Sequence, residues 1–549
     1  MLKITIAQIN PILGDLNFNS KIILENANAA SDGGSDVLIT PELSLTGYPP
    51  EDLLLRTSFL EQVDKKLNEL IRRVRNSSPE LTVIVGHPLA DKNNKYLFNA
   101  ATVFRSGKII GRYGKLELPN YTVFDERRYF DPDGSPFIFD IKGVNCALNI
   151  CEDVWFSRAP KMAKAAGADI ILILNASPFH ANKQKERMAV VKKNISKIGL
   201  PAVFCNMVGG QDELIFDGNS FVMDKNANIL VNAHQFKNDL ISFDYHKNSI
   251  LKAGRIEKPK EFLLQIYNAL VVGTRDYASK NDFKSVLIGL SGGIDSALTL
   301  SIAVEALGSK NVVAVMMPSK YTSELSLNDS KLCAENLGVN LQIISIESLI
   351  QEFDNSLFES FRGLSKDVTE ENLQSRIRGV LLMALANKNK SLLLTTGNKS
   401  EIAVGYCTLY GDMCGGYSVL KDVVKTLVYD LSRFINKQSK KLGKLTPIPE
   451  SVINRPPSAE LAYDQKDEDS LPSYKILDDI VIGYMENYLS FKDLVNLGYP
   501  EETVVKVLRL IKISEFKRRQ SAPGARITKN SFGRDWRYPI SNCFSEYGD

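Results

Sequence analysis

The sequence predicts a two-domain α/β protein in which strands and helices form layers. The chain has 549 residues, which is too long for a single hydrophobic core; length alone would allow roughly three or four domains. The motifs described below favour two large ones. The first part mixes short apolar runs with amphipathic stretches, which is typical of sheets packed between helices. The second part alternates strand and helix regularly, which predicts a doubly wound, Rossmann-like parallel sheet.

The first predicted domain covers residues 1–245. Its predicted strands are short apolar runs, several of which are bounded by turn-forming residues. They are residues 3–9, 36–40, 83–86, 98–104, 146–150, 169–174, 202–207 and 220–223. Amphipathic stretches at 58–75 and 182–199 predict helices between some of them.

The second predicted domain covers residues 261–549. Residues 246–260 are predicted to be a linker, because they are polar and basic and show no periodicity. The predicted strands of the second domain are residues 285–290, 312–317, 341–346 and 391–396. They alternate with predicted helices at 261–280, 296–307, 328–337 and 372–387.

Composition and charge argue against several classes of protein. Hydrophobic residues make up 44% and charged residues 24%, as in ordinary globular proteins, and the net charge of +3 is too small to imply a nucleic-acid partner. The seven cysteines include no CxxC pair, which argues against a disulfide framework or a zinc site and predicts a cytoplasmic location. The N-terminus resembles a strand and not a signal peptide, and the apolar runs are too short to span a membrane.

A glycine-rich turn, Gly289-Leu-Ser-Gly-Gly-Ile-Asp-Ser296, links a predicted strand to a predicted helix. Gly292 and Gly293 let the backbone approach an anion, and the helix start offers unpaired N–H groups. The turn lacks the Gly-Lys-Ser/Thr ending of a Walker A loop, so no lysine is placed on a terminal phosphate. The turn therefore suits a bound pyrophosphate, and Asp295 would be free to hold magnesium.

Three residues of the first domain form a candidate catalytic set. Cys151 ends a predicted strand and enters a turn, where we expect it to be exposed enough to attack a carbonyl. Glu42 could take its proton, and Lys115 could stabilise the oxyanion that forms. Each residue alone is more simply interpreted as a buried cysteine or a solvated charge.

Taken together, the three residues resemble the catalytic set of the nitrilase or carbon–nitrogen hydrolase family, which has Glu, Lys and Cys in this order. The matching strings are Pro41-Glu-Leu43, Lys115-Leu-Glu-Leu-Pro119 and Asn149-Ile-Cys-Glu-Asp153. The resemblance implies an αββα sandwich and amide hydrolysis through a thioester. Cys205 lacks such flanks and is expected to lie in the core.

The string from Leu118 to Phe130 is similar to the glutaminase branch that is fused to NAD synthetases. In that branch, positions that match Tyr121, Ser177 and Lys183 hold the glutamine. The resemblance also suggests that Glu126 supports Lys115.

The turn 289–296 resembles the signature of the N-type ATP pyrophosphatases, which adenylate a carbonyl oxygen and then displace AMP with ammonia. With Leu394-Thr-Thr-Gly-Asn-Lys-Ser-Glu401 and the tail strings after Phe516, nearly the whole chain resembles the glutamine-dependent NAD synthetases. The resemblance implies that ATP is bound by Gly289, Leu290, Ser291, Gly292, Gly293, Ile294, Asp295, Ser296 and Thr396. It implies that deamido-NAD is bound by Asn372, Glu401, Asp412 and Lys517, and we expect Asp295 and Glu401 to share a magnesium ion.

One departure concerns Asn454-Arg-Pro-Pro-Ser-Ala-Glu-Leu461, where simpler synthetases carry Lys/Arg-x-Pro-Thr-Ala-Asp-Leu. Ser458 keeps the hydroxyl of that motif. The predicted function is the amidation of deamido-NAD with ammonia from L-glutamine, at the expense of ATP. One alternative keeps this chemistry but uses another carboxylate as acceptor; the other is a nucleotide-sensing scaffold with inactive sites. The resemblance implies a homo-oligomer, and no membrane partner is expected.

Overall fold

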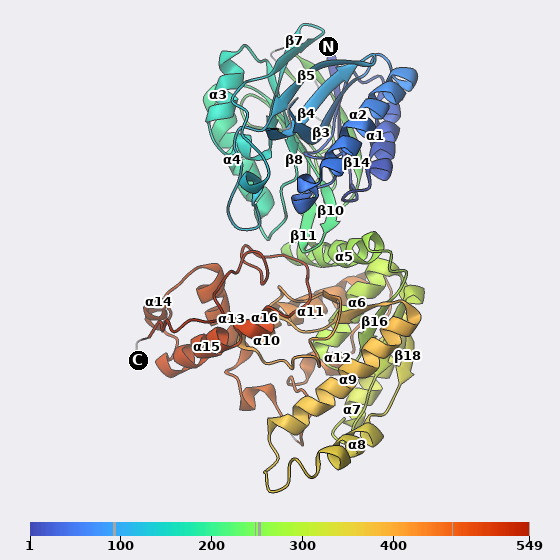
Figure 1. The fold of residues 1–549 in the computed structure, drawn as a ribbon, viewed down its shortest axis with the longest axis vertical. Coiled ribbons are helices and arrows are strands. Elements are labelled where there is room, and N and C mark those ends of the chain that lie inside the picture. Colours follow the sequence, from blue (N-terminus) through green and yellow to red (C-terminus); the bar gives the residue numbers. More distant parts are fainter. Residues whose placement is uncertain (92–94, 248, 251–253, 464, 548–549) are drawn as a thin grey trace. The chain divides into compact units, whose positions relative to one another are not determined.

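A computed structural model describes residues 1–91, 95–247, 249–250, 254–463 and 465–547. Its contacts divide the chain into two compact units, Met1–Lys260 and Glu261–Asp549 (Figure 1). Parts of three predicted segments lie outside the described residues: 92–94 of the first domain, 248 and 251–253 of the linker, and 464, 548 and 549 of the second domain.

The first unit contains two large sheets and a small hairpin. The larger sheet has the strand order β15-β14-β1-β2-β3-β4-β5, with bounds β1 (Leu2–Gln8), β2 (Val37–Ile39), β3 (Thr82–Ala90), β4 (Leu97–Arg105), β5 (Lys108–Gly114), β14 (Asp239–His246) and β15 (Ser249–Ile250). The second sheet has the order β13-β12-β9-β8-β7-β6, with bounds β6 (Ile138–Ile141), β7 (Val144–Ile150), β8 (Ile170–Asn175), β9 (Ala202–Asn206), β12 (Phe221–Met223) and β13 (Ile229–Asn232). The hairpin pairs β10 (Val208–Gln211) with β11 (Leu214–Asp217).

Helices cover the outer face of each large sheet in this unit. Helices α1 (Leu16–Asp32) and α2 (Thr57–Ser77) lie side by side and pack on the larger sheet (Figure 1). Helices α3 (Arg158–Ala165) and α4 (Lys183–Ile198) pack on the second sheet. A third apolar core, which includes Cys205, fills the space between the sheets. These layers confirm the predicted αββα sandwich.

The second unit is built on a five-stranded parallel sheet with the order β18-β17-β16-β19-β20. Its strands are β16 (Val286–Gly289), β17 (Val312–Met316), β18 (Asn340–Ile343), β19 (Leu392–Thr395) and β20 (Tyr417–Ser418). Successive strands move outward from β16 in one direction and then in the other, which places helices on both faces. Helices α6 (Ile294–Leu307), α7 (Glu324–Leu337) and α9 (Val368–Asn389) pack on its strands. Helices α5 (Phe262–Lys280) and α11 (Lys425–Lys441) pack against α6, and α8 (Glu347–Leu357) packs against α9. The predicted doubly wound parallel sheet is confirmed.

A separate helical cluster completes the second unit. Its apolar core joins α10 (Lys399–Val404) to α13 (Tyr474–Val481), α14 (Phe491–Asn496), α15 (Glu501–Ile513) and the aromatic side chain of Phe532. Two further short helices are α12 (Glu450–Asn454) and α16 (Glu515–Arg518). None of the helices in the described part of the chain is both long and apolar enough to cross a membrane.

The C-terminal tail is attached to this cluster by a buried lysine, Lys399. Its ammonium group lies 2.8 Å from Asp422, 2.7 Å from Glu486 and 2.9 Å from the Thr528 hydroxyl. The backbone N–H groups of Ile527 and Thr528 donate to Asp422 as well, both at 2.7 Å. Because a buried ammonium is costly without partners, these contacts hold the tail against the first residue of α10.

Candidate active sites

The catalytic set predicted for the first unit comes from the ends of three strands. Glu42 follows β2 and Lys115 follows β5, so both come from the larger sheet, whereas Cys151 follows β7 of the second sheet. Because the two sheets pack face to face, residues at their strand ends can meet. The structure joins Lys115 to Glu42 directly, at 2.7 Å, and the charges of both act on the Cys151 thiol.

Lys115 is completely buried between two carboxylates. Its ammonium lies 2.7 Å from Glu42 and 2.7 Å from Glu126. Burial alone would lower the pKa of Lys115, but the charges of Glu126 and Glu42 outweigh this effect and hold the pKa well above its usual range. Lys115 therefore remains a cation, as an oxyanion-stabilising group must.

The carboxylate of Glu42 is oriented by two further donors. Asn99 donates to one oxygen at 2.8 Å, and the backbone N–H of Ala176 donates to the other at 2.9 Å. The second carboxylate, Glu126, accepts from the Tyr48 hydroxyl at 2.8 Å. Burial raises the pKa of Glu126, although the Lys115 charge opposes this. The contact of Glu126 with Lys115 is the one that the sequence suggested.

The expectation that Cys151 is exposed is wrong, because its side chain is only 3% exposed. Burial, followed by the charge of Glu42, raises the pKa of the thiol, while the charge of Lys115 lowers it. The residue has a φ of 44°, a left-handed conformation that costs a non-glycine residue about 1–2 kcal/mol. Such strain persists only where the surrounding contacts fix the backbone.

The three residues predicted to bind glutamine lie on different segments near this set. The Tyr121 hydroxyl donates to Glu152 at 2.9 Å, and Tyr121 is half exposed. The Lys183 ammonium lies 4.3 Å from the centre of the Trp155 ring. Burial lowers the pKa of Lys183, and the charge of Cys151 is among the groups that act on it.

The third of these residues, Ser177, is held by a residue that the sequence analysis missed. Ser177 follows β8 and accepts a hydrogen bond at 3.0 Å from Arg187, a fully buried residue of α4. Arg187 also pairs with Asp217 at 2.6 Å. An arginine inside a helix of mixed charge gives no sequence signal of burial, so only the fold reveals this support.

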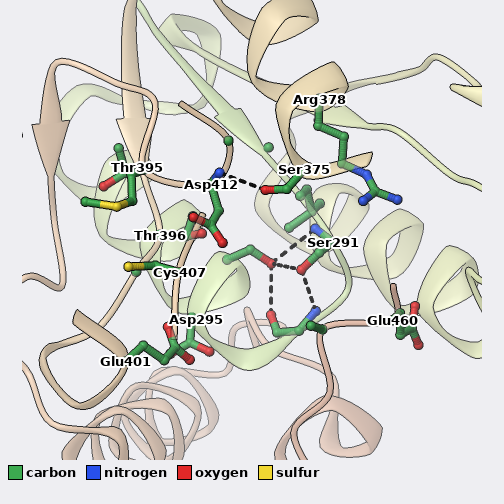
Figure 2. A pocket seen from close by; sticks show the side chains of 18 of the residues that line it. Ser291, Asp295, Ser375, Arg378, Thr395, Thr396, Glu401, Cys407, Asp412 and Glu460 are labelled. Atoms are coloured by element: carbon green, nitrogen blue, oxygen red, sulfur yellow. Dashed lines mark hydrogen bonds between the residues drawn. The ribbon is translucent and has the colours of Figure 1, made fainter. Parts of the chain in front are cut away.

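The glycine-rich turn of the second unit connects β16 to α6, as predicted. Gly292 has a φ of +81°, and a Cβ atom there would lie 2.5 Å from the carbonyl oxygen of Ser326, so only glycine fits. The hydroxyl groups of Ser291 and Ser296 lie 3.1 Å apart, and Ser296 donates to the carbonyl of Gly293 at 2.9 Å (Figure 2). These hydrogen bonds connect the two ends of the turn.

Asp295 and Glu401 lie side by side, as Figure 2 shows, but Asp295 is not free as the sequence suggested. The ammonium of Lys425 lies 2.5 Å from Asp295 and 3.1 Å from Glu401. Burial raises the pKa of Glu401, against the effect of the Lys425 charge. Lys425 was missed by the sequence analysis. It is the first residue of α11, a helix that the sequence analysis did not predict.

A pocket of about 300 Å³ surrounds these groups. Most residues predicted for the nucleotide sites line it: Gly289, Leu290, Ser291, Gly293, Ile294, Asp295, Ser296, Thr396, Glu401 and Asp412. Gly292, Asn372 and Lys517 are not among the lining residues. Instead, Asn372 accepts a hydrogen bond from Thr408 at 2.7 Å, and Lys517 donates to the carbonyls of Gly405 and Cys407. These two residues shape the segment that carries Asp412.

Two arginines that the sequence analysis did not assign also line the pocket. Arg378 of α9 donates to the carbonyl of Met317 at 3.0 Å, and burial lowers its pKa to about 10. Figure 2 shows it across the pocket from Glu401. Arg455 donates to the carbonyl of Gly292 at 2.5 Å. Ser458 also lines the pocket, and its hydroxyl donates to the carbonyl of Gln465.

The residues available for a metal are the two carboxylates already described. Among the described residues, no group of three or more His, Cys, Asp and Glu side chains is arranged to hold a metal ion. Asp295 and Glu401 nevertheless share one cation, the Lys425 ammonium, which shows that both carboxylates point to the same place. Magnesium is usually held by one or two carboxylates together with substrate phosphates, so this pair fits it.

Comparisons with known proteins extend over both units. Residues 3–251 match the carbon-nitrogen hydrolase family and residues 266–521 match the NAD synthase family. The chain is 43% identical over 545 residues to the glutamine-dependent NAD(+) synthetase of Acinetobacter baylyi, with 98% of each chain covered. It is 41% identical over 580 residues to that of Thermotoga maritima, with 99% of each covered.

Two solved structures have the same fold over nearly the whole chain. One is a glutamine-dependent NAD+ synthetase from Acinetobacter baumannii in complex with ADP, with 41% identity, a TM-score of 0.79 and 98% of each chain covered. The other is a glutamine-dependent NAD(+) synthetase from Cytophaga hutchinsonii, with 22% identity, a TM-score of 0.82 and the same coverage.

Proposed function

Because the chain belongs to the family of glutamine-dependent NAD(+) synthetases, we propose that its first unit releases ammonia from L-glutamine and its second unit uses that ammonia to convert deamido-NAD to NAD. The reaction consumes ATP. The observation that supports two separate reactions is the placement of the two sites. The buried Glu42, Lys115 and Cys151 lie in the first unit, and the turn 289–296, which suits a pyrophosphate, lies in the second. We place the reaction in the cytoplasm, on the cysteine usage.

In the first half-reaction, Glu42 takes the proton of the Cys151 thiol as sulfur attacks the side-chain carbonyl of glutamine. Lys115 stabilises the oxyanion that forms. Glu42 gives this proton to the departing nitrogen as the carbon–nitrogen bond breaks, so that ammonia leaves. Water then hydrolyses the remaining thioester to glutamate and frees the thiol. We assign Tyr121, Ser177 and Lys183 to the binding of glutamine. Support comes from the 2.7 Å contact between Lys115 and Glu42 and from the charges that reach Cys151.

In the second half-reaction, the nicotinate carboxylate of deamido-NAD attacks the α-phosphate of ATP. Pyrophosphate leaves, held by the N–H groups and hydroxyls of the turn 289–296, and ammonia then displaces AMP from the adenylate. Asp295 and Glu401 would hold magnesium, which neutralises phosphate charge when it is bound. We assign Thr396 to the binding of ATP. The Lys425 ammonium, which pairs with Asp295 and Glu401, could pair with a phosphate oxygen instead.

We assign Asn372, Glu401, Asp412 and Lys517 to the dinucleotide. Glu401 and Asp412 line the pocket. Asn372 and Lys517 support the segment that carries Asp412, so their contribution can be indirect. Arg378 adds a cation that can face the phosphates of either nucleotide.

The test of this function is the pair of products formed from ATP. A turn with no lysine on the γ-phosphate favours cleavage at the α-phosphate, so we expect one AMP and one pyrophosphate for each NAD, and no ADP. The reaction is run with deamido-NAD, glutamine and α-labelled ATP, and the nucleotides are separated. Label that enters ADP in step with NAD would contradict the proposal. Replacing deamido-NAD with other carboxylic acids tests the acceptor.

We also propose that the protein forms a homo-oligomer, dimer or larger. Helix α8 has no buried residue, and large apolar side chains are exposed from α8 to the first residue of α9: Phe353, Phe358, Leu364 and Val368. A second copy could cover this apolar segment. Sedimentation should show a species larger than a monomer, and Phe358→Asp with Leu364→Asp should shift it to a smaller one. A monomeric wild type at micromolar concentration would contradict this.

A further inference from the structure

A buried carboxylate, Asp153, lies two residues after Cys151 and is not used in the reaction described above. Its side chain is completely buried. One oxygen accepts from the backbone N–H groups of Leu116 at 3.0 Å and Glu117 at 2.8 Å. The other oxygen accepts from the Tyr113 hydroxyl at 2.7 Å and the backbone N–H of Ile150 at 2.8 Å.

These four donors belong to two separate segments. Tyr113, Leu116 and Glu117 flank Lys115, whereas Ile150 directly precedes Cys151. The first segment continues from β5 of the larger sheet, and the second ends β7 of the other sheet. A single carboxylate therefore bridges the backbone of the lysine segment and the backbone of the cysteine turn.

Burying the carboxylate of Asp153 costs free energy, which its hydrogen bonds must offset. No ion-pair partner of Asp153 appears in the part of the chain that the structure describes, so these donors, with the more distant charge of Lys115, stabilise its carboxylate. Burial raises its pKa to about 6, while the bonds from Ile150, Glu117 and Tyr113 lower it. Asp153 is therefore mainly ionised at neutral pH, and it can accept all four hydrogen bonds only in this form.

We propose that Asp153 is a positioning residue of the glutaminase unit, which sets the distance between the Lys115 ammonium and the Cys151 thiol. This inference rests on the proposed roles of Lys115 and Cys151. The left-handed conformation of Cys151 needs contacts that hold it. Asp153 supplies such a contact by accepting from the N–H of Ile150, the residue before Cys151. The same carboxylate also binds the backbone of the segment that carries Lys115.

The test is Asp153→Asn in the full-length protein. An asparagine has one acceptor oxygen and turns an N–H group toward backbone donors, so the bridge breaks on one side. We expect kcat for glutamine hydrolysis to fall about 100-fold, the usual effect of a misplacement of about 1 Å. We expect KM for glutamine to change less than about twofold, because Asp153 contacts none of the residues assigned to glutamine. NAD formation from ammonium salts should be unchanged.

Two measurements separate positioning from a loss of folded protein. A diazoketone analogue of glutamine counts the Cys151 sites that still react, and kcat is expressed per labelled site. Asp169→Asn is the matched control. Asp169 accepts from the N–H of Asn145 at 2.9 Å, and Asn145 lies near the end of β7 that is opposite to Ile150. This variant should leave kcat at the wild-type value. A wild-type kcat per site in Asp153→Asn, or a change in KM alone, would overturn the inference.

A second variant decides the matter if Asp153→Asn does not fold. Tyr113→Phe removes one donor and keeps the ring, and it should lower kcat about threefold without changing KM, as expected for one net hydrogen bond. A wild-type kcat in this variant would overturn the inference. Cys151→Ala tests the proposed catalytic set separately from the proposed role of Asp153. If it keeps glutamine hydrolysis, the proposed catalytic set is wrong; if it does not, a failure of the Asp153 variants concerns Asp153 alone.

Discussion

Cys151→Ala is expected to abolish NAD formation from glutamine and to leave NAD formation from ammonium salts intact. In the proposed reaction the sulfur atom of Cys151 forms the thioester, and alanine supplies no nucleophile in its place. We expect the glutamine-driven rate to fall by about 10⁴-fold or more, as when the nucleophile of a hydrolase is removed. The second unit has its own pocket and needs only ammonia from the first.

Steady-state NAD formation with each nitrogen source, at saturating ATP and deamido-NAD, checks this result. Cys205→Ala is the matched control, because Cys205 is a buried cysteine of the same unit that lies in the core between the sheets. It should keep glutamine-driven synthesis. If Cys151→Ala kept it too, the nucleophile would be misassigned. If ammonium-driven synthesis failed as well, the two units would not act as separately as proposed.

The second large effect is expected at the carboxylate pair of the synthetase unit. Asp295→Asn and Glu401→Gln should each lower NAD formation by about 10²- to 10³-fold with either nitrogen source, because they remove the negative charge that would hold magnesium in the proposed reaction. Chelation of magnesium should stop the wild-type reaction. Glutamine hydrolysis should continue at a basal level, because the first unit does not use this pocket.

The measurement is the rate of NAD formation as a function of magnesium concentration. Glu305→Gln is the matched control, since Glu305 is an exposed residue of α6, the helix that carries Asp295. It should retain the wild-type rate at every magnesium concentration. Normal rates for Asp295→Asn and Glu401→Gln at limiting magnesium would show that these residues are not the metal ligands.

The buried strands and the long helices could be predicted from the sequence because their apolar patterns are strong. Strand β17 (Val312–Met316) and helix α9 (Val368–Asn389) are examples. Strand β5 (Lys108–Gly114) was missed because it lies at the edge of its sheet and most of it is exposed, so its residues show little alternation. Helix α8 (Glu347–Leu357) was missed as well, and it has no buried residue.

Some of the site residues could be predicted from a local sequence pattern, and others could not. The turn 289–296 has a local sequence pattern, so its chemistry could be inferred without the fold. Lys425, Arg187 and Asp153 are charged residues whose burial depends on partners far away in the sequence. A charged residue is exposed in most proteins, and nothing in its neighbours along the chain marks it as an exception. Such residues can be found only after the strands have been brought together.

The buried Lys399 has a consequence for how the protein is made on the ribosome. Two of its contacts, Asp422 and Thr528, lie 23 and 129 residues away along the chain. The first unit needs β14 to pair with β1, so it can close once Tyr245 has left the exit tunnel. The second unit keeps an under-satisfied buried ammonium until Thr528 has been added. A nascent chain that stalls between these two points therefore carries a finished glutaminase beside an unfinished synthetase.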